Sequence, residues 1–211
     1  MLLFLVRHAV TSHTGNRLSG WIPGIHLSDE GKGQVASLVE LMRPVRLVAF
    51  YSSPLERCVE TAKPVAASKG LRLRVRAELG EVRYGAWEGK KMESLTKTKL
   101  WRTVQGRPSE VRFPDGESLR ETQARAVDGI ERIRNDHLHE AVAVSTHADV
   151  IRLLAAHYAG IHLDLYQRVS ISPASVSVFW LGGGGPRILK LNETGSLEGL
   201  VPPRPAKKKA R

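Results

Sequence analysis

Short runs of apolar residues, each bounded by polar ones, recur along this chain. The first occupies residues 2–6 (LLFLV), and similar runs occupy residues 47–51 (LVAFY) and 141–145 (AVAVS). Runs of about five apolar residues are typical of strands that are buried on both faces of a parallel sheet. The pattern therefore predicts that these three segments are strands of one parallel sheet.

Apolar residues at helical spacing separate these runs. Ser28 has the pattern of a helix N-cap, and Pro44 ends the helix that follows it. Ser118 and Glu121 form the pattern of a capping box at the head of another helix. Pro64 is expected to kink or break the helix in which it lies. The spacing predicts helices over residues 28–44, 55–70, 118–133 and 149–158.

The remaining segments complete the expected fold. Residues 71–75 alternate apolar and arginine side chains, as in a half-exposed strand, and residues 176–181 and 188–191 predict an antiparallel hairpin at the edge of the sheet. Residues 78–116 show no long period and are expected to form a cap with one short helix near residues 92–104. The predicted fold class is α/β, a three-layer α/β/α sandwich with a mostly parallel sheet and a small cap formed by this central insertion.

The composition is that of a globular protein with one domain of ordinary size. Of 211 residues, 42% are hydrophobic and 25% are charged. We assign the domain to residues 1–200. The apolar start is too short for a signal peptide or a membrane span, and the single Cys58 allows no internal disulfide. We therefore expect a cytoplasmic protein with no membrane partner.

The C-terminal residues carry much of the chain's formal net charge of +11. Residues 201–211 are rich in proline, contain no acidic residue, and are expected to form a disordered basic tail. Such a tail can contact polyanions nonspecifically. No aromatic residue is interleaved with its lysines, so a specific nucleic-acid partner is not expected.

Cationic and imidazole side chains follow three of the predicted strands. Arg7 and His8 follow the first strand, Arg57 lies after the second, and His147 follows the third. Ligands bind at the carboxyl ends of parallel strands, where these side chains are expected to converge. Two arginines can hold the oxygens of a phosphoryl group, and a histidine kept neutral by nearby guanidinium groups can attack phosphorus. Each residue alone could equally be a solvated or packing side chain.

Several sequence blocks, in this order, cover most of the chain. They are residues 5–11 (LVRHAVT), 18–21 (LSGW), 52–57 (SSPLER) with Thr61 and Ala62, 81–89 (EVRYGAWEG), 114–118 (PDGES) and 144–147 (VSTH). In these blocks the chain resembles the histidine phosphatase superfamily, also called phosphoglycerate mutase-like.

The resemblance implies catalysis through a phosphohistidine, with no metal and no cofactor. His8 would be the nucleophile, and Glu81 would donate a proton to the leaving group, although spacing alone would leave Glu81 an ordinary surface carboxylate. Arg7, Arg57 and His147 would bind the phosphoryl oxygens, so that His8, Glu81 and His147 form the implied catalytic set. Further contacts to phosphate or substrate are implied for Thr14, Ser19, Gly20 and the backbone N–H of Ala148.

The chain departs from the usual family pattern in three places. Ala9 stands where the family has glycine, which fits if the backbone there has a negative φ. Thr14 stands where the family often has asparagine, and the nearby Asn16 leaves open which side chain makes that contact. The paired-arginine, proline-rich stretch of the glycolytic mutases is missing after Glu81. Hydrolysis of small phosphomonoesters is therefore favoured over mutase chemistry.

Other interpretations remain open from the sequence. The chain could be a phosphomutase, or a module that binds phosphate or a polyanion without turnover. His147 with Asp149 could bind a metal, although no carboxylate cluster supports such a site. Trp21 and Trp87 could pack in the core or contact substrate. The expected partner is a small phosphorylated substrate, and the chain could be a monomer or, through an edge strand near residues 176–181, a homodimer.

Overall fold

The predicted strands join in one six-stranded sheet in the computed structural model, which describes residues 1–197. The order across the sheet is β3-β2-β4-β1-β5-β6. The strands are β1 (Leu2–Arg7), β2 (Ala49–Ser52), β3 (Leu73–Val75), β4 (Ala141–Thr146), β5 (Val176–Gly182) and β6 (Gly185–Glu193). β1, β2, β3 and β4 run parallel, and β5 and β6 are antiparallel additions. The expected mostly parallel sheet is confirmed, while the predicted tail at residues 201–211 lies outside the described residues.

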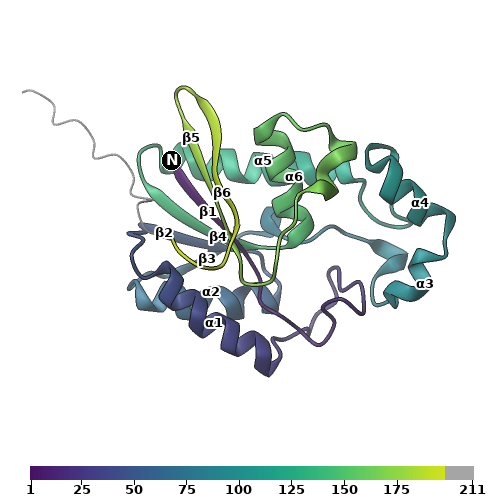
Figure 1. The fold of residues 1–211 in the computed structure, drawn as a ribbon, viewed down its shortest axis with the longest axis horizontal. Coiled ribbons are helices and arrows are strands. Elements are labelled where there is room, and N and C mark those ends of the chain that lie inside the picture. The colour runs from purple at the N-terminus through teal and green to yellow at the C-terminus, as the bar shows by residue number, and fades with distance from the viewer. Residues whose placement is uncertain (198–211) are drawn as a thin grey trace, which may run out of the picture.

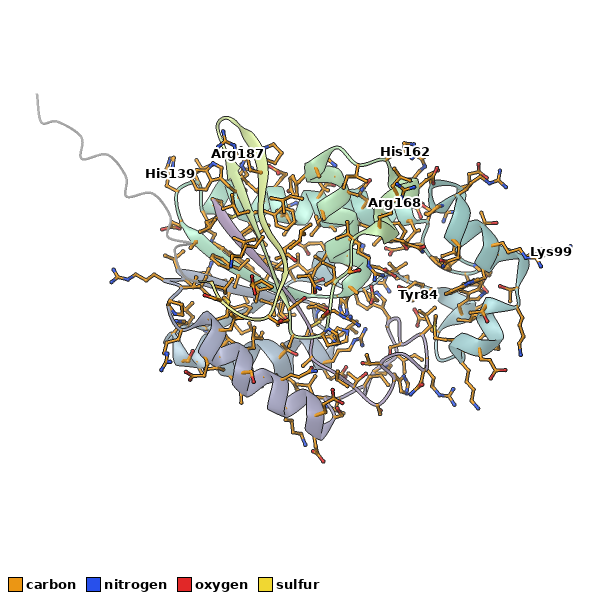
Figure 2. All side chains as sticks on the ribbon, in the orientation of Figure 1. Tyr84, Lys99, His139, His162, Arg168 and Arg187 are labelled. Carbon is orange, nitrogen blue, oxygen red and sulfur yellow. The ribbon has the colours of Figure 1, made fainter. Side chains whose placement is uncertain are left out.

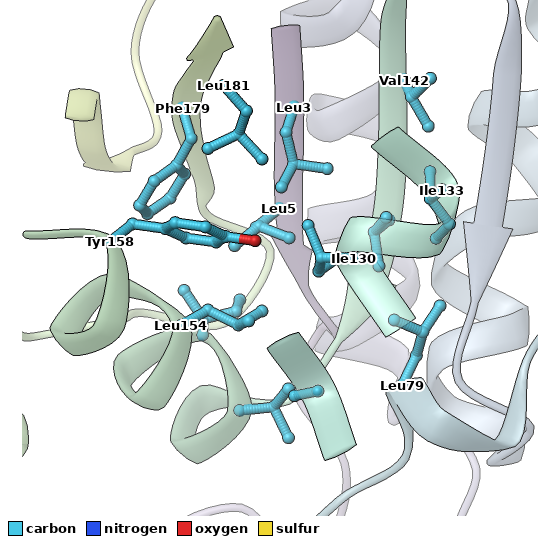
Figure 3. Packing of buried hydrophobic residues seen from close by; sticks show 14 of the residues in the cluster. Leu3, Leu5, Leu79, Ile130, Ile133, Val142, Leu154, Tyr158, Phe179 and Leu181 are labelled. Carbon is cyan, nitrogen blue, oxygen red and sulfur yellow. The ribbon is translucent and has the colours of Figure 1, made fainter. Parts of the chain in front are cut away.

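Helices cover both faces of this sheet, as expected for three layers (Figure 1). On one face, α1 (Asp29–Met42) and α2 (Glu56–Ser68) pack against the even-numbered side chains of β1, such as Phe4. On the other face, α5 (Leu119–Asp136) and α6 (Ala148–Ala159) pack against the odd-numbered side chains, Leu3 and Leu5 (Figure 3). Successive side chains of a strand point to opposite faces of the sheet. Because helices cover both faces, the side chains on both faces are apolar.

Two local expectations are not met: α2 is not broken at Pro64, and residues 176–181 are not at the edge of the sheet. α2 continues without a break through Pro64, which lies on the exposed face of the helix, so that the carbonyl deprived of an N–H partner is on the side facing solvent. β5 pairs with β1 as well as with β6, so residues 176–181 are not an edge strand. The edge of the sheet on that side is β6.

The central segment forms a cap with two helices, where the sequence predicted one. They are α3 (Met92–Thr96) and α4 (Lys99–Gly106), and the Thr98 side chain accepts a hydrogen bond from the backbone N–H of Trp101 at the start of α4. This N-cap begins a second helix. Short 3-10 helices flank the cap: η1 (Ala77–Leu79), η2 (Gly85–Trp87), η3 (Pro108–Glu110) and, after α6, η4 (Leu163–Arg168). The cap projects to the right of the sandwich in Figure 1.

The cap has its own apolar core, which joins it to the sandwich. Val104 and Leu95 of the cap are buried in one cluster with Tyr84, Phe113 and Leu153. The capping box at the head of α5 is present as predicted, with Ser118 and Glu121 bonded reciprocally. Within residues 1–197, no helix is both long enough and apolar enough to cross a membrane.

Candidate active site

The carboxyl ends of β1 and β4 place two histidines next to each other. Arg7 pairs with Thr146 at the ends of these strands, and the backbone N–H of His8 still donates to the carbonyl of Thr146 at 2.9 Å. The rings of His8 and His147 therefore lie edge to face, with their centroids 5.3 Å apart. Arg57, in the first turn of α2, reaches the same place, as its contact with His147 shows. The four predicted side chains are brought together.

His8 is held as a neutral imidazole with one nitrogen available. Its Nδ1 lies 2.8 Å from the carbonyl oxygen of Ala9, and because a carbonyl only accepts, Nδ1 carries the hydrogen. The lone pair is then on Nε2. Burial, together with the charges of Arg57 and Arg7, lowers the pKa of His8 to about 3. Ala9 is not among the residues with positive φ, so the expectation that alanine fits here is confirmed.

The guanidinium groups of Arg57 and Arg7 carry donors that the protein does not satisfy. Arg57 is 1% exposed, and one of its terminal nitrogens donates to the carbonyl of Gly20 at 2.8 Å. Its Nε and Nη1 have no hydrogen-bond partner among residues 1–197, nor has the Nε of Arg7, whose Nη1 donates to the carbonyl of Ile171. Both residues line a cavity of about 340 Å³ together with His8. Buried guanidinium groups that line a cavity and have unpaired donors are suited to binding an anion.

His147 forms the back of this site. Its ring is fully buried, with Nε2 2.8 Å from the Ser53 hydroxyl and Nδ1 3.3 Å from a terminal nitrogen of Arg57. Because guanidinium only donates, Nδ1 accepts and Nε2 donates to Ser53 in this arrangement. Burial and the charge of Arg57 hold the pKa of His147 well below its usual value. His147 is thus a neutral side chain behind His8 and Arg57.

Glu81 lies in the wall of the same cavity, close to His147. Its Oε2 is 3.6 Å from Nδ1 of His147, and its Oε1 accepts from the backbone N–H of Val82. Burial, followed by the nearby carboxylate of Asp149, raises the pKa of Glu81 to about 7. A carboxyl group with this pKa can both give and take a proton near neutral pH. Glu81 lines the same cavity as His8.

The loop after β1 contributes three of the other predicted residues to the cavity wall or its support. Thr14 and Ser19 line the cavity, and Asn16 does not. Gly20 is not a lining residue, but its carbonyl holds Arg57. Ala148, the first residue of α6, also lines the cavity. The geometry therefore favours Thr14 over Asn16 as the residue that faces a ligand.

The sequence offered Asp149 only as a possible metal ligand with His147, and it assigned no role to Tyr84 or Arg152. Asp149 accepts a hydrogen bond from the hydroxyl of Tyr84 at 2.6 Å and forms an ion pair with Arg152 at 2.9 Å. All three line the cavity, and Tyr84 lies where the cap meets the sandwich (Figure 2). The spacing of Asp149 and Arg152, three apart at the start of a helix, was the available signal. Among the described residues, no three His, Cys, Asp or Glu side chains form a cluster that could hold a metal.

Arg125 of α5 fixes the loop that carries Glu81. Its terminal nitrogens donate to the backbone carbonyls of Glu78, Gly80 and Glu81 at 2.8–3.2 Å. The same guanidinium forms a 2.8 Å ion pair with Glu117, which precedes α5, and this pair holds the Arg125 side chain in place. The backbone of the Glu81 loop is therefore anchored to α5.

Comparison with known proteins agrees with this geometry. The sequence profile of the histidine phosphatase superfamily (branch 1) matches residues 3–194. Phosphoserine phosphatase 1 of Hydrogenobacter thermophilus is 30% identical over 91% of this chain and 92% of its own length, and phosphoglycerate mutase-like protein 4 of Arabidopsis thaliana is 29% identical over 93% and 89%. The solved structure of Bacillus stearothermophilus YhfR superposes with a TM-score of 0.85 at 25% identity, covering 91% of this chain and 96% of that chain. The chain belongs to the histidine phosphatase superfamily.

Proposed function

We propose that this protein is a phosphatase that hydrolyses small phosphomonoesters without a metal ion, through a phosphohistidine on His8. The observation that carries the proposal is the pair of unpaired donors on the buried guanidinium of Arg57, beside an imidazole whose Nε2 lone pair is available. A phosphoryl group supplies the acceptor oxygens that Arg57 and Arg7 lack, and it presents phosphorus to His8.

In the first half-reaction, Nε2 of His8 forms a bond to phosphorus while the bond from phosphorus to the leaving-group oxygen breaks. Glu81, in its carboxylic acid form, gives its proton to that oxygen, and the alcohol departs. Arg7 and Arg57 stabilise the charge on the remaining phosphoryl oxygens. His147 does not line the cavity; it lies behind His8 and positions Arg57 through its Nδ1.

In the second half-reaction, water replaces the alcohol. The Glu81 carboxylate takes a proton from water as the oxygen attacks phosphorus, and the bond from phosphorus to Nε2 of His8 breaks. Phosphate leaves, and His8 and Glu81 return to their starting protonation states. The pKa of Glu81 near 7 suits both roles at one pH.

The test is phosphate release from p-nitrophenyl phosphate by the wild type and by His8→Ala, each with and without EDTA. We expect wild-type activity that survives the chelator and a loss of at least about 10³-fold in the variant, because the nucleophile is gone. His139→Ala is the matched control, since His139 is exposed and lies far from the site (Figure 2). Activity that persists in His8→Ala, or that EDTA abolishes, would contradict the mechanism.

Product analysis separates hydrolysis from its rivals. Phosphoserine and phosphoglycerate are the first biological substrates to try, since the relatives named above are a phosphoserine phosphatase and a phosphoglycerate mutase-like protein. Release of inorganic phosphate supports the proposal, and transfer to a second hydroxyl would make the protein a mutase. A truncation that lacks residues 201–211 should keep its turnover; a module that binds polyanions through those residues would lose its binding.

A further inference from the structure

A second cavity, of about 310 Å³, adjoins the one that contains His8. The two cavities share lining residues, among them Leu18, Tyr84 and Met92, so a ligand can extend from one into the other. The second cavity lies under the cap, because Trp101 and Val104 of α4 form part of its wall. The alcohol part of a phosphate ester bound at His8 can therefore extend into the second cavity.

Five of the twelve described residues that line this second cavity, which we call the aromatic pocket, are aromatic. Trp87 stacks on Trp101 with centroids 6.3 Å apart, and Phe113 meets the edge of Trp87 at 5.4 Å and of Tyr84 at 4.9 Å. Tyr166 of η4 completes the set. These rings are packed against one another, so this part of the pocket is formed before a ligand arrives and suits an apolar or planar group. Gln105 and Gln167 add uncharged polar groups to the wall.

The charges of the aromatic pocket are already paired. Among residues 1–197, the charged side chains that line it are Asp149 and Arg152, which form an ion pair with each other. Asp149 also accepts from Tyr84, and Arg152 also donates to the carbonyl of Val169. In this pocket a carboxylate or a second phosphate on the substrate would compete with Asp149 for Arg152 and would lie near the Asp149 carboxylate, which repels it. The pocket therefore disfavours a charged leaving group.

We propose that the preferred substrates are phosphomonoesters of uncharged alcohols that bear an aromatic or extended apolar group, which binds in the aromatic pocket while the phosphoryl group occupies the site at His8. The proposal rests on the phosphatase function above and specifies its substrate class. It sets this chain apart from enzymes that act on phosphoserine or phosphoglycerate, whose leaving groups carry charge.

The test compares two alkyl esters whose alcohols have closely similar acidity, propyl phosphate and 3-phenylpropyl phosphate. Their intrinsic reactivity is matched, so a difference in kcat/KM reports binding of the phenyl ring. We expect kcat/KM to be higher for the phenylpropyl ester by on the order of 10- to 100-fold, as for burial of a phenylalanine side chain. Phosphoserine, tested alongside, should be a poorer substrate than the phenylpropyl ester.

Variants locate the preference in the molecule. Trp101→Ala should lower the ratio of the two kcat/KM values by about fivefold or more, and Trp101→Phe should retain most of it. Trp180→Ala is the matched control, because Trp180 lies in β5 against the α1 and α2 side of the core and should leave the ratio unchanged. Circular dichroism checks that each variant is folded.

Binding of phosphonates keeps this proposal separate from the catalytic one. Calorimetry with propylphosphonate and 3-phenylpropylphosphonate measures the same preference without turnover. If neither ester is hydrolysed but the phenylpropyl compound binds more tightly, the proposed phosphatase function fails and the aromatic pocket stands as a binding site. Equal affinity for the two phosphonates, equal kcat/KM for the two esters, or a preference for phosphoserine would overturn the inference.

Discussion

Burial drives the reacting side chains of the site toward their neutral forms, and this has opposite consequences for an imidazole and a carboxyl group. The pKa of His8 falls to about 3, so the ring is unprotonated across the neutral range, as the proposed nucleophile requires. The pKa of Glu81 rises to about 7, so the group holds a proton to donate. Burial in one cavity therefore keeps His8 as a neutral imidazole and Glu81 as a carboxylic acid.

The pH dependence of kcat/KM with an alkyl ester should follow Glu81. Below a pH of about 7 the carboxyl is protonated and can donate; above it, the rate should fall about tenfold per pH unit as the acid is lost. His8 should impose no loss until the pH approaches about 3. Asp149→Asn removes the neighbouring charge that raises the pKa of Glu81, so the alkaline limb should move to lower pH.

The measurement is a pH profile for the wild type, Asp149→Asn and Glu81→Gln. Glu81→Gln has no proton to lose at this position and should show no alkaline limb from this group. An unchanged alkaline limb in Glu81→Gln would mean that another residue supplies the acid.

At this scale the sequence predicted some residues better than others. His8, Arg57 and His147 could be placed together because each follows a recognisable strand, and strand ends converge. Glu81 lies in an irregular segment where spacing gives no direction, so only the resemblance of its block identified it. The roles of Tyr84 and Arg125 were missed because they depend on contacts across elements, which no local pattern encodes. The spacing of Asp149 and Arg152 indicates an ion pair, but it does not indicate that the pair lines the cavity.

Among the elements, the start of α1 holds the chain just beyond His8. The carbonyl of Val10 accepts from the backbone N–H and the hydroxyl of Ser28, and the backbone N–H of Val10 donates to Gln34. Gly31 allows this approach, because a Cβ at that position would lie 2.1 Å from the carbonyl oxygen of Val10. The opposing atom is backbone and cannot rotate away.

Gly31→Ala should therefore lower the free energy of unfolding by about 1–3 kcal/mol, as overpacking does. Gly33→Ala is the matched control in the same helix, since no atom lies within 4 Å of its added Cβ, and it should raise stability by about 0.5–1 kcal/mol. Chemical denaturation measures both. Equal effects of the two substitutions would show that the contact with Val10 does not constrain α1.

Element boundaries show where sequence reasoning was weakest. The strands and long helices were predicted because their apolar periods are regular, but two short cap helices were merged into one. The deciding feature was Thr98, whose side chain begins a helix, and a polar threonine between lysines gives little warning of that role. The place of β5 inside the sheet follows from its pairing with β1, a long-range contact that local alternation cannot specify.

For the molecule as a whole, the buried arginines of the proposed anion site lower the free energy of unfolding. The unpaired donors of Arg57 and Arg7 remain buried when the site is empty, which lowers the stability of the free protein, and an anion that satisfies them binds only the folded state. Function and stability therefore oppose each other at this position.

Phosphate at about 100 times its Kd should raise the free energy of unfolding by about 2.7 kcal/mol, or Tm by about 5–10 °C for a chain of this size. Arg57→Met, which keeps the volume and removes the charge, should have a Tm without phosphate no lower than that of the wild type and should lose the phosphate-induced shift. Thermal unfolding with phosphate and with chloride measures this. A variant that melts well below the wild type and still responds to phosphate would refute the argument.

The anchoring of the Glu81 loop by Arg125 bears on how such a protein can diversify. The guanidinium ties the loop of Glu81, the proposed general acid, to α5 through backbone carbonyls, independently of α3 and α4, which lie later in the chain. Mutations in the cap can therefore reshape the aromatic pocket while the acid and the nucleophile keep their places. Substrate preference can therefore change during evolution without loss of the catalytic residues, because the cap and the Glu81 loop are held by separate sets of contacts.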